Sequence, residues 1–212
     1  MEPNIFVNYR DWLEQQKMPK GKKAALVAAM ELFSEDGFDG TSTVDVAKKA
    51  GISQATIFKY FHTKQDLMVA IVRPVMEHFF PKYRDEFFAD LGKQKTLSEM
   101  VHFFVTDRYA FIRGNEEVVK IMAMEMMTNA DMRALFGKVV RGNDFDFWGE
   151  LLGIFRGTGE LRDDIDAAGI VRIIGGQVVV YLIQANFAPV LVHGDEQDLQ
   201  IISDQIVRTL KK

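Results

Sequence analysis

Apolar residues recur along the chain at the three- to four-residue spacing of an amphipathic α-helix. The first clear run is Leu26, Ala29, Met30 and Phe33, which fall at i, i+3, i+4 and i+7, and Gly37 follows where a left-handed helix stop would lie. No segment shows the two-residue alternation of a half-buried strand in convincing form. The pattern therefore predicts an all-α protein whose first firm helix spans about 20–36.

Polar residues that can cap helices divide the next stretch into short helices. A serine or threonine with an acid three residues later is the pattern of a capping box, in which each side chain satisfies the other residue's backbone N–H. The predicted helix starts are Ser42 with Asp45, Ser53, and Thr63 with Asp66. We expect helices from about 42 to Gly51, over 54–60 and from 63 onward.

The remainder of the chain also has helical periodicity, with two prolines that interrupt it. Pro74 lacks an N–H and crowds the carbonyl of Ala70, so a kink or break is expected there, and Pro81 repeats the problem. The later predicted helices are 96–113, 116–128, 131–155, 163–187 and 195–210. The expected fold has about nine helices, plus a possible short helix in the N-terminal extension, residues 1–18.

The segment "AGIS" joins two short helices in the pattern of a helix-turn-helix. The first helix can set Val46, Ala47 and Ala50 against the second, whose outward face carries mainly short or hydrogen-bonding side chains. At 1.5 Å per residue the second helix is about 10 Å long, small enough for a DNA major groove about 12 Å wide. A glycine turn between short helices is also common in proteins that bind no DNA, so the motif alone leaves both interpretations open.

Charge is distributed unevenly along the chain. The whole protein has a formal net charge of −4. Residues 17–64 contain eight lysines and five acids, which gives 8 − 5 = +3, whereas the regions on either side are acidic. A local basic patch suits phosphate binding, because salt-dependent affinity depends on the charges at the contact.

Residues 22–70 resemble the N-terminal domain of the TetR/AcrR family of transcriptional regulators. The resemblance rests on the landmarks A-x-x-L-F-x-x-x-G-F, T-S, V-A-x-x-A-G-I-S and Y-F-x-x-K-x-x-L. It implies a DNA-binding domain over 19–64, an effector-binding and dimerisation domain over 65–212, and a homodimer that reads a near-palindromic double-stranded DNA operator. It further implies a repressor released by a small-molecule effector.

The resemblance, together with the hydroxyls at the helix starts, supplies the candidate DNA contacts. Thr43, Gln54, Ala55 and Thr56 are placed near base edges or adjacent phosphates, and the other candidates near the DNA backbone. The full predicted set is Thr41, Ser42, Thr43, Ser53, Gln54, Ala55, Thr56, Lys59, Tyr60 and Lys64. The family commonly has Tyr where this chain has Phe58, and often His at position 60, so the phosphate contact is expected to move to Tyr60.

Polar residues on apolar helices are candidates for an effector pocket, although each also suits an ordinary core or surface position. They are His102, Glu125, Trp148, Gln177 and Tyr181. Within the last two predicted helices, Gly175 and Gly176 permit close approach of another helix, and an apolar stripe from Leu199 to Leu210 favours a dimer formed through these helices. In the N-terminal extension, Phe6, Tyr9 and Leu13 share a face, which favours packing on the body over an arm that contacts DNA.

Other function classes have weaker support. The chain has no cysteine, no His pair at i, i+4, no Walker-type glycine loop and no nucleophile elbow, so we expect no enzyme, metal site or cofactor. Polar residues interrupt the most apolar segment, and the N-terminus lacks a signal-peptide pattern, so a cytoplasmic protein free of the membrane is expected. A helical adaptor or ligand-binding protein without DNA affinity remains the alternative.

Overall fold

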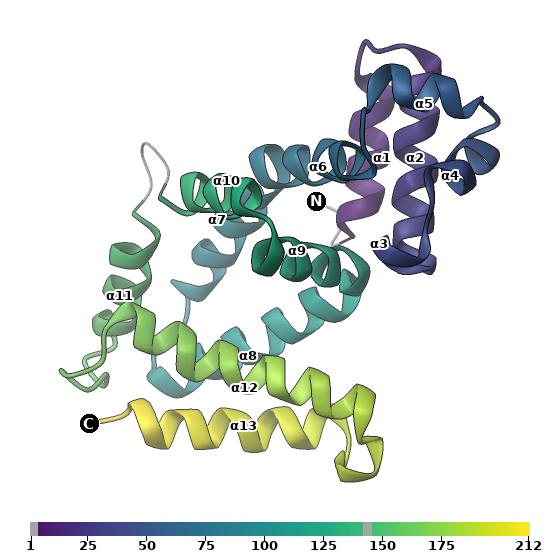
Figure 1. Cartoon of the computed structure of the whole chain (residues 1–212). Helices are drawn as coiled ribbons and strands as arrows, with labels where there is room; N and C mark the ends of the chain where they lie inside the picture. Colours follow the sequence, from purple (N-terminus) through teal and green to yellow (C-terminus); the bar gives the residue numbers. More distant parts are fainter. Residues whose placement is uncertain (1–3, 142–145) are drawn as a thin grey trace. The chain divides into compact units, whose positions relative to one another are not determined.

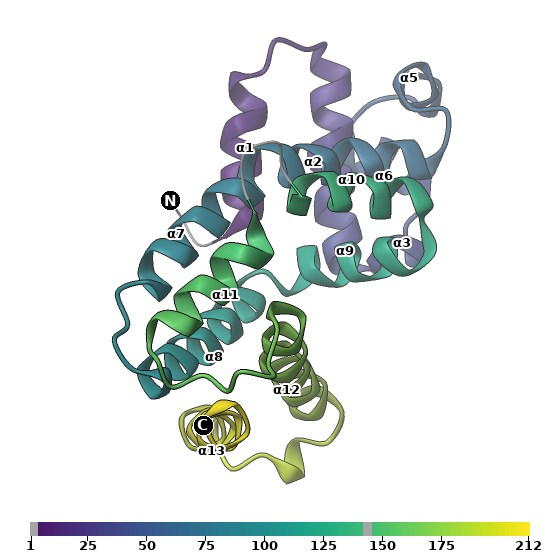
Figure 2. The same cartoon turned by 90° about the vertical axis from the view of Figure 1, so that its left-hand side faces the viewer.

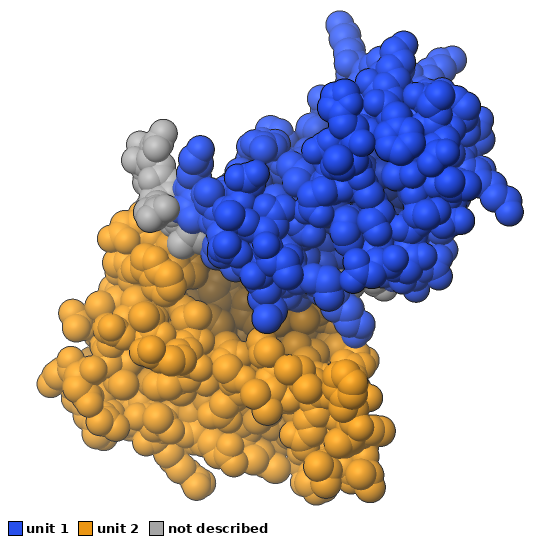
Figure 3. All heavy atoms as spheres, in the orientation of Figure 1, with its two compact units in different colours: residues 1–82, 114–139 blue, residues 83–113, 140–212 orange. Residues whose placement is uncertain are grey.

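The computed structural model describes residues 4–141 and 146–212, except for the side chains of residues 117 and 139–141. Helices dominate, and the described residues contain no strand apart from an isolated antiparallel bridge between Leu161 and Lys211. The all-α prediction is confirmed. The chain divides into two compact units, residues 1–82 with 114–139 and residues 83–113 with 140–212, which are coloured separately in Figure 3.

Unit 1 contains the predicted helix-turn-helix and two helices from later in the chain. Its helices are α1 (Ile5–Gln15), α2 (Lys20–Glu35), α3 (Gly37–Gly40), α4 (Thr43–Ala50), α5 (Gln54–Tyr60), α6 (Lys64–Pro74), α9 (Glu116–Thr128) and most of α10 (Ala130–Arg141). Figure 1 shows α4 and α5 beside α2. The compact units and the predicted domains therefore divide the chain differently, because α9 and α10 belong to unit 1.

The helix starts between residues 42 and 66 form as predicted. Ser42 with Asp45 and Thr63 with Asp66 each make both bonds of a capping box, and the Ser53 side chain accepts from the backbone N–H of Thr56. α4 ends at Gly51, whose φ of 66° lies in the left-handed region that favours glycine. These helix ends follow from interactions within a few residues, which is why the pattern could locate them.

Pro74 ends α6, as expected from its missing N–H. The chain continues as a π-helix, Val75–Phe79, before α7 begins at Phe80. Pro81 is the second residue of α7, which continues the π-helix without a break.

Unit 2 is built around an aromatic and aliphatic core. Its helices are α7 (Phe80–Leu91, from Tyr83 onward), α8 (Leu97–Gly114, as far as Arg113), α11 (Phe147–Gly157), α12 (Ala167–Phe187) and α13 (Asp195–Leu210), with a short 3-10 turn at Pro189–Leu191. Phe104, Phe155 and Ile174 are among the buried residues of this core. α12 and α13 run side by side in both Figure 1 and Figure 2.

Two predicted helices differ from the structure. The expected helix 131–155 is two helices, α10 and α11, and Asp146 caps the second by accepting from the N–H of Gly149 at 3.0 Å. The expected helix 163–187 begins at Ala167, because Asp166 is its N-cap. These breaks, together with α3 and the interruption after Pro74, explain why the described residues form more helices than the nine expected.

α12 is 21 residues long and apolar enough to cross a membrane by length and composition alone. A third of its most apolar window is buried inside the protein, and Ile170, Ile174 and Val178 belong to the core of unit 2. Such a helix is weak evidence for a membrane span, because core helices of soluble proteins meet the same criteria.

Candidate nucleic-acid interface

The two helices of the helix-turn-helix are held by a small buried core. Val46 and Ala47 of α4, Ile57 of α5 and Phe61 directly after α5 are all buried. The backbone N–H of Ile52 donates to the carbonyl of Ala47 at 3.0 Å, which closes the turn between the helices. The apolar faces of α4 and α5 thus pack against each other, and the opposite face of α5 is exposed.

The exposed face of α5 carries Gln54, Ala55 and Lys59. The Gln54 amide nitrogen donates to the Thr43 hydroxyl at 3.2 Å, so the first residues of α4 and α5 lie together. Val44, which the sequence interpretation did not select, is 55% exposed beside Thr43. An amide, small apolar groups and a cation form a surface suited to base edges, thymine methyl groups and phosphate.

Three predicted hydroxyl contacts have local partners. Ser42 and Ser53 cap α4 and α5 and remain exposed, and the Thr56 hydroxyl lies 2.8 Å from that of Ser53. Hydrogen bonds from the Ser42 side chain and backbone hold the pKa of Asp45 below its usual value. The caps therefore set the start of each helix, and the serine hydroxyls stay at the surface where phosphate could reach them.

Thr41 and Lys64 are tied to the interior of unit 1. Thr41 is only 2% exposed, and its hydroxyl donates to the carbonyls of Leu32 and Gly37 at 3.2 and 2.9 Å. The Lys64 ammonium donates to the carbonyls of Phe38 and Thr41 at 2.8 and 3.1 Å and lies 4.2 Å from the centre of the Phe38 ring. Both arrangements fit the positioning of the α3–α4 segment better than a direct contact with DNA.

The aromatic residues of α5 differ in exposure. Phe58 is 43% exposed, whereas Tyr60 is half-buried and its ring lies 5.7 Å from the Lys59 ammonium. In the described part of the chain the Tyr60 hydroxyl has no hydrogen-bond partner. The phosphate contact expected of Tyr60 stays a prediction.

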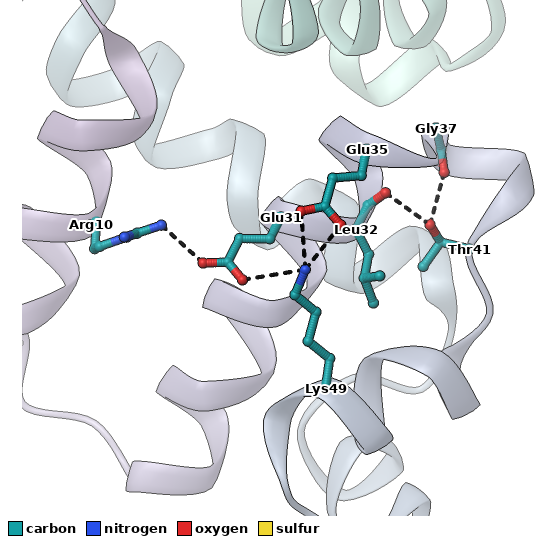
Figure 4. A network of polar contacts seen from close by, with 7 residues as sticks. All are labelled: Arg10, Glu31, Leu32, Glu35, Gly37, Thr41 and Lys49. Carbon is teal, nitrogen blue, oxygen red and sulfur yellow. Dashed lines mark hydrogen bonds and ion pairs between the residues drawn. The ribbon is translucent and has the colours of Figure 1, made fainter.

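An ion-pair network joins the N-terminal helix to the helix-turn-helix (Figure 4). The Arg10 guanidinium of α1 lies 2.9 Å from Glu31 of α2, and the Lys49 ammonium of α4 lies 3.5 Å from Glu31 and 3.1 Å from Glu35. The hydrogen bond that Lys49 donates to Glu35, together with the charges of both glutamates, raises the pKa of Lys49. Lys49 is thus paired within the protein and contributes less to the basic surface than its place in the sequence suggests.

The N-terminal helix packs on unit 1 through Ile5, Tyr9 and Leu13. Phe6, expected on that face, is only half-buried, because the buried positions follow the i, i+4, i+8 spacing from Ile5. The Tyr9 hydroxyl donates to the carbonyl of Ala70 at 3.2 Å. This packing matches the preferred interpretation of the extension as a helix on the body of the protein.

The five candidate effector residues are divided between the two units. Glu125 is buried in unit 1, and the other four lie in unit 2. There, His102 lines one hollow, Gln177 and Tyr181 line another beside α13, and Trp148 is 42% exposed. The Tyr181 hydroxyl donates to Asp195 at 2.8 Å, and burial together with this bond raises its pKa.

The chain is similar to bacterial regulatory proteins. Residues 25–71 match the family model described as "Bacterial regulatory proteins, tetR family". Over 200 residues the chain is 22% identical to the fatty acid metabolism regulator protein of Bacillus subtilis (strain 168), covering 92% of this chain and 96% of that protein. It is 24% identical over 189 residues to the HTH-type transcriptional repressor KstR2 of Rhodococcus jostii (strain RHA1), covering 82% and 91%.

Solved structures share the fold. The crystal structure of the transcriptional regulator FadR from Bacillus subtilis in complex with stearoyl-CoA matches with a TM-score of 0.59 and 19% identity, covering 89% of this chain and 97% of that chain. At 19% identity this similarity shows that the two proteins share the arrangement of their helices.

Proposed function

We propose that this chain, whose residues 25–71 match the model of the tetR family of bacterial regulatory proteins, is a transcriptional repressor that a small-molecule effector releases from its operator. The observation that supports this most directly is the exposed face of α5, with Gln54, Ala55 and Lys59 on a helix fixed from behind by Ile57. In this proposal residues 19–64 contact DNA, and residues 65–212 bind the effector and a second copy of the chain.

The DNA-binding function is tested by salt dependence. Fluorescence anisotropy with labelled promoter fragments from beside its own gene should show binding that weakens linearly in log[salt], with a slope near −0.9 for each phosphate neutralised. An unrelated fragment of equal length serves as the control and should bind far more weakly. Absent binding, or binding that is independent of salt, would favour a helical adaptor without DNA affinity.

The dimer is proposed to form through α12 and α13. Val179, Val180, Ile183 and Phe187 of α12 are 49 to 86% exposed, and Ile201 of α13 is 42% exposed. An apolar surface of this kind on a soluble regulator is stabilised when a second copy covers it. A two-fold dimer would place two copies of α5 about one DNA turn, about 34 Å, apart on a near-palindromic operator.

We infer that the effector is a long-chain fatty acyl-CoA. The support is the similarity along most of the chain to a fatty acid metabolism regulator and the shared fold with a regulator bound to stearoyl-CoA. The interior of unit 2 is rich in aromatic rings, including Phe87, Phe103 and Phe104, which suits an acyl chain. A cytoplasmic location follows from the proposed access to DNA and acyl-CoA.

The effector proposal has a direct test. Stearoyl-CoA should release the protein from operator DNA at micromolar concentration, whereas free CoA should not, because it lacks the apolar chain. Stearate has the same acyl chain without CoA. Measuring release from DNA with stearate therefore shows whether the chain alone is sufficient or the whole thioester is required. Release by CoA alone, or no release by stearoyl-CoA from a DNA complex already established, would overturn the acyl-CoA assignment and leave the DNA-binding function intact.

A further inference from the structure

A second candidate ligand site lies within unit 1, whereas the aromatic core proposed for the acyl chain belongs to unit 2. It is a pocket of about 840 Å³ between the end of α2, α3, the buried side of α6 and α9. Its apolar wall includes Phe33, Phe38, Met68, Ile121 and Met124. Its apolar lining and its volume are those of a small-molecule site.

Glu125 supplies the polar feature of this pocket. Its side chain lines the pocket but is only 5% exposed. Two amides donate to the same carboxylate oxygen, Gln65 of α6 at 2.6 Å and Asn129 at 2.9 Å. Within the described part of the chain no lysine, arginine or histidine forms an ion pair with it, so a buried carboxylate is held by neutral donors only.

The charges around the pocket favour a cation. Among the described residues of the lining, three are acids and one is a lysine. Glu116 lies 2.7 Å from the Lys120 ammonium, and Glu35 lies 3.1 Å from the ammonium of Lys49, which leaves Glu125 without a cationic partner. A buried carboxylate without a cationic partner gains more from an ion pair than an exposed one, because the surrounding medium screens the pair less. The site thus combines an apolar wall with one unneutralised negative group.

From this arrangement we propose that the pocket binds an amphipathic organic cation, with an aromatic or alkyl body against the methionine and phenylalanine side chains and an ammonium group on the Glu125 carboxylate. Methionine side chains adapt to ligands of different shape, which suits a site of this composition. The Phe38 ring of the wall is the ring on which Lys64 stacks, so a ligand here touches the segment that leads into α4.

The proposal is tested with two probes of matched size on the full-length protein. 4-Phenylbutylamine carries an ammonium at neutral pH, and 4-phenylbutan-1-ol is its neutral counterpart. Isothermal titration calorimetry should show the amine binding about tenfold more tightly than the alcohol, a difference of about 1.4 kcal/mol, because only the ammonium group can form an ion pair with the carboxylate. Equal affinity, or no binding of the amine, would overturn the proposal.

Substitutions in the pocket lining show whether the probes bind at this site. Glu125→Gln should reduce the preference for the amine to about one, whereas Glu116→Gln, on the same helix and in the same pocket, should keep it. Ala123 is exposed in the pocket lining, so Ala123→Trp should block both probes without disturbing the core even if Glu125→Gln proves unstable. Retention of the preference in Glu125→Gln, or unchanged binding in Ala123→Trp, would contradict the assignment. These readouts involve neither DNA nor acyl-CoA, so they are independent of the proposed function.

Discussion

Helices α5 and α12 each leave one face exposed, and the chemistry of the two faces differs. α5 presents an amide, a methyl group and an ammonium, from Gln54, Ala55 and Lys59. α12 presents aliphatic and aromatic groups, with Val180 60% and Phe187 86% exposed. The first surface is already well solvated and binds by matching charge and hydrogen bonds, whereas the second gains by losing contact with water, at about 25 cal/mol per Å².

The two faces also depend on different parts of the chain. α5 is short and is oriented by caps and turns close to it in sequence, such as Ser53 and Gly51. α12 is oriented by a core drawn from α11 and α13, which precede and follow it, and from α8, which is distant in sequence. The comparison predicts that substitutions on α12 change assembly, whereas those on α5 change DNA selection.

The largest expected effect comes from charging the apolar face of α12. Val180→Glu with Ile183→Glu should convert a dimer into monomers and lower operator affinity at least about 100-fold, because a monomer makes only half of the base contacts. Analytical ultracentrifugation and operator titration measure the two effects. Val7→Glu, an exposed apolar residue of α1, is the matched control and should leave the dimer intact. A double variant that remains dimeric would contradict a dimer formed through this face of α12.

A smaller and more selective effect is expected on α5. Gln54→Ala should cost about 1–3 kcal/mol for the best operator and relax sequence choice, since an amide can bond a base edge in two places. Lys59→Ala should weaken all sequences alike and reduce the salt slope by about one, because a single phosphate contact is lost. Titrations against the operator and single-base variants at several salt concentrations separate the two. The reverse pattern would exchange the roles assigned to these residues.

The helix-turn-helix was predictable from sequence because its determinants are local. The caps at Ser42, Ser53 and Thr63 and the stop at Gly51 act over three or four residues, and the structure has them where the pattern indicates. The resemblance to the TetR family rests on the same segment. The start of α11 was missed although Asp146 is a capping residue, because apolar periodicity continues on both sides of it.

Long-range partners could not be predicted. Lys49 counts as a basic residue in the sequence, but it pairs with Glu31 and Glu35, which lie on another helix. Glu125 suits an effector pocket by its chemistry, and its bond to Gln65, 60 residues away, became evident only in the fold. Residue type and spacing indicate what a side chain can do, whereas packing decides which groups are already engaged.

A substitution of Thr41 tests whether this residue contacts DNA or stabilises the fold. Because its hydroxyl is buried and donates to two carbonyls, Thr41→Val should lower the free energy of unfolding by about 1 kcal/mol through the lost hydrogen bonds. DNA affinity of the folded protein should change little. Thr43→Val, at the half-buried start of α4, should show the opposite pattern. Chemical denaturation and operator titration measure both quantities, and weaker DNA binding at unchanged stability in Thr41→Val would make this residue a contact.

The smallest expected effect concerns the cap of α4 and appears only in acid. The folded-state pKa of Asp45 is lowered by the bonds from Ser42, so its contribution to stability is complete above its unfolded pKa of about 4 and is lost as the pH falls through the folded value. The stability difference between wild type and Asp45→Asn should therefore shrink in this acid range and stay constant at neutral pH. In a Ser42→Ala background part of that pH dependence should disappear, because the side-chain hydrogen bond, which lowers the pKa of Asp45 most, is gone while the bond from the backbone N–H of residue 42 remains. Urea titrations from pH 3 to 7 measure the difference. An undiminished pH dependence without the Ser42 hydroxyl would assign the lowered pKa to the backbone N–H of residue 42 and the charge of Lys48 instead.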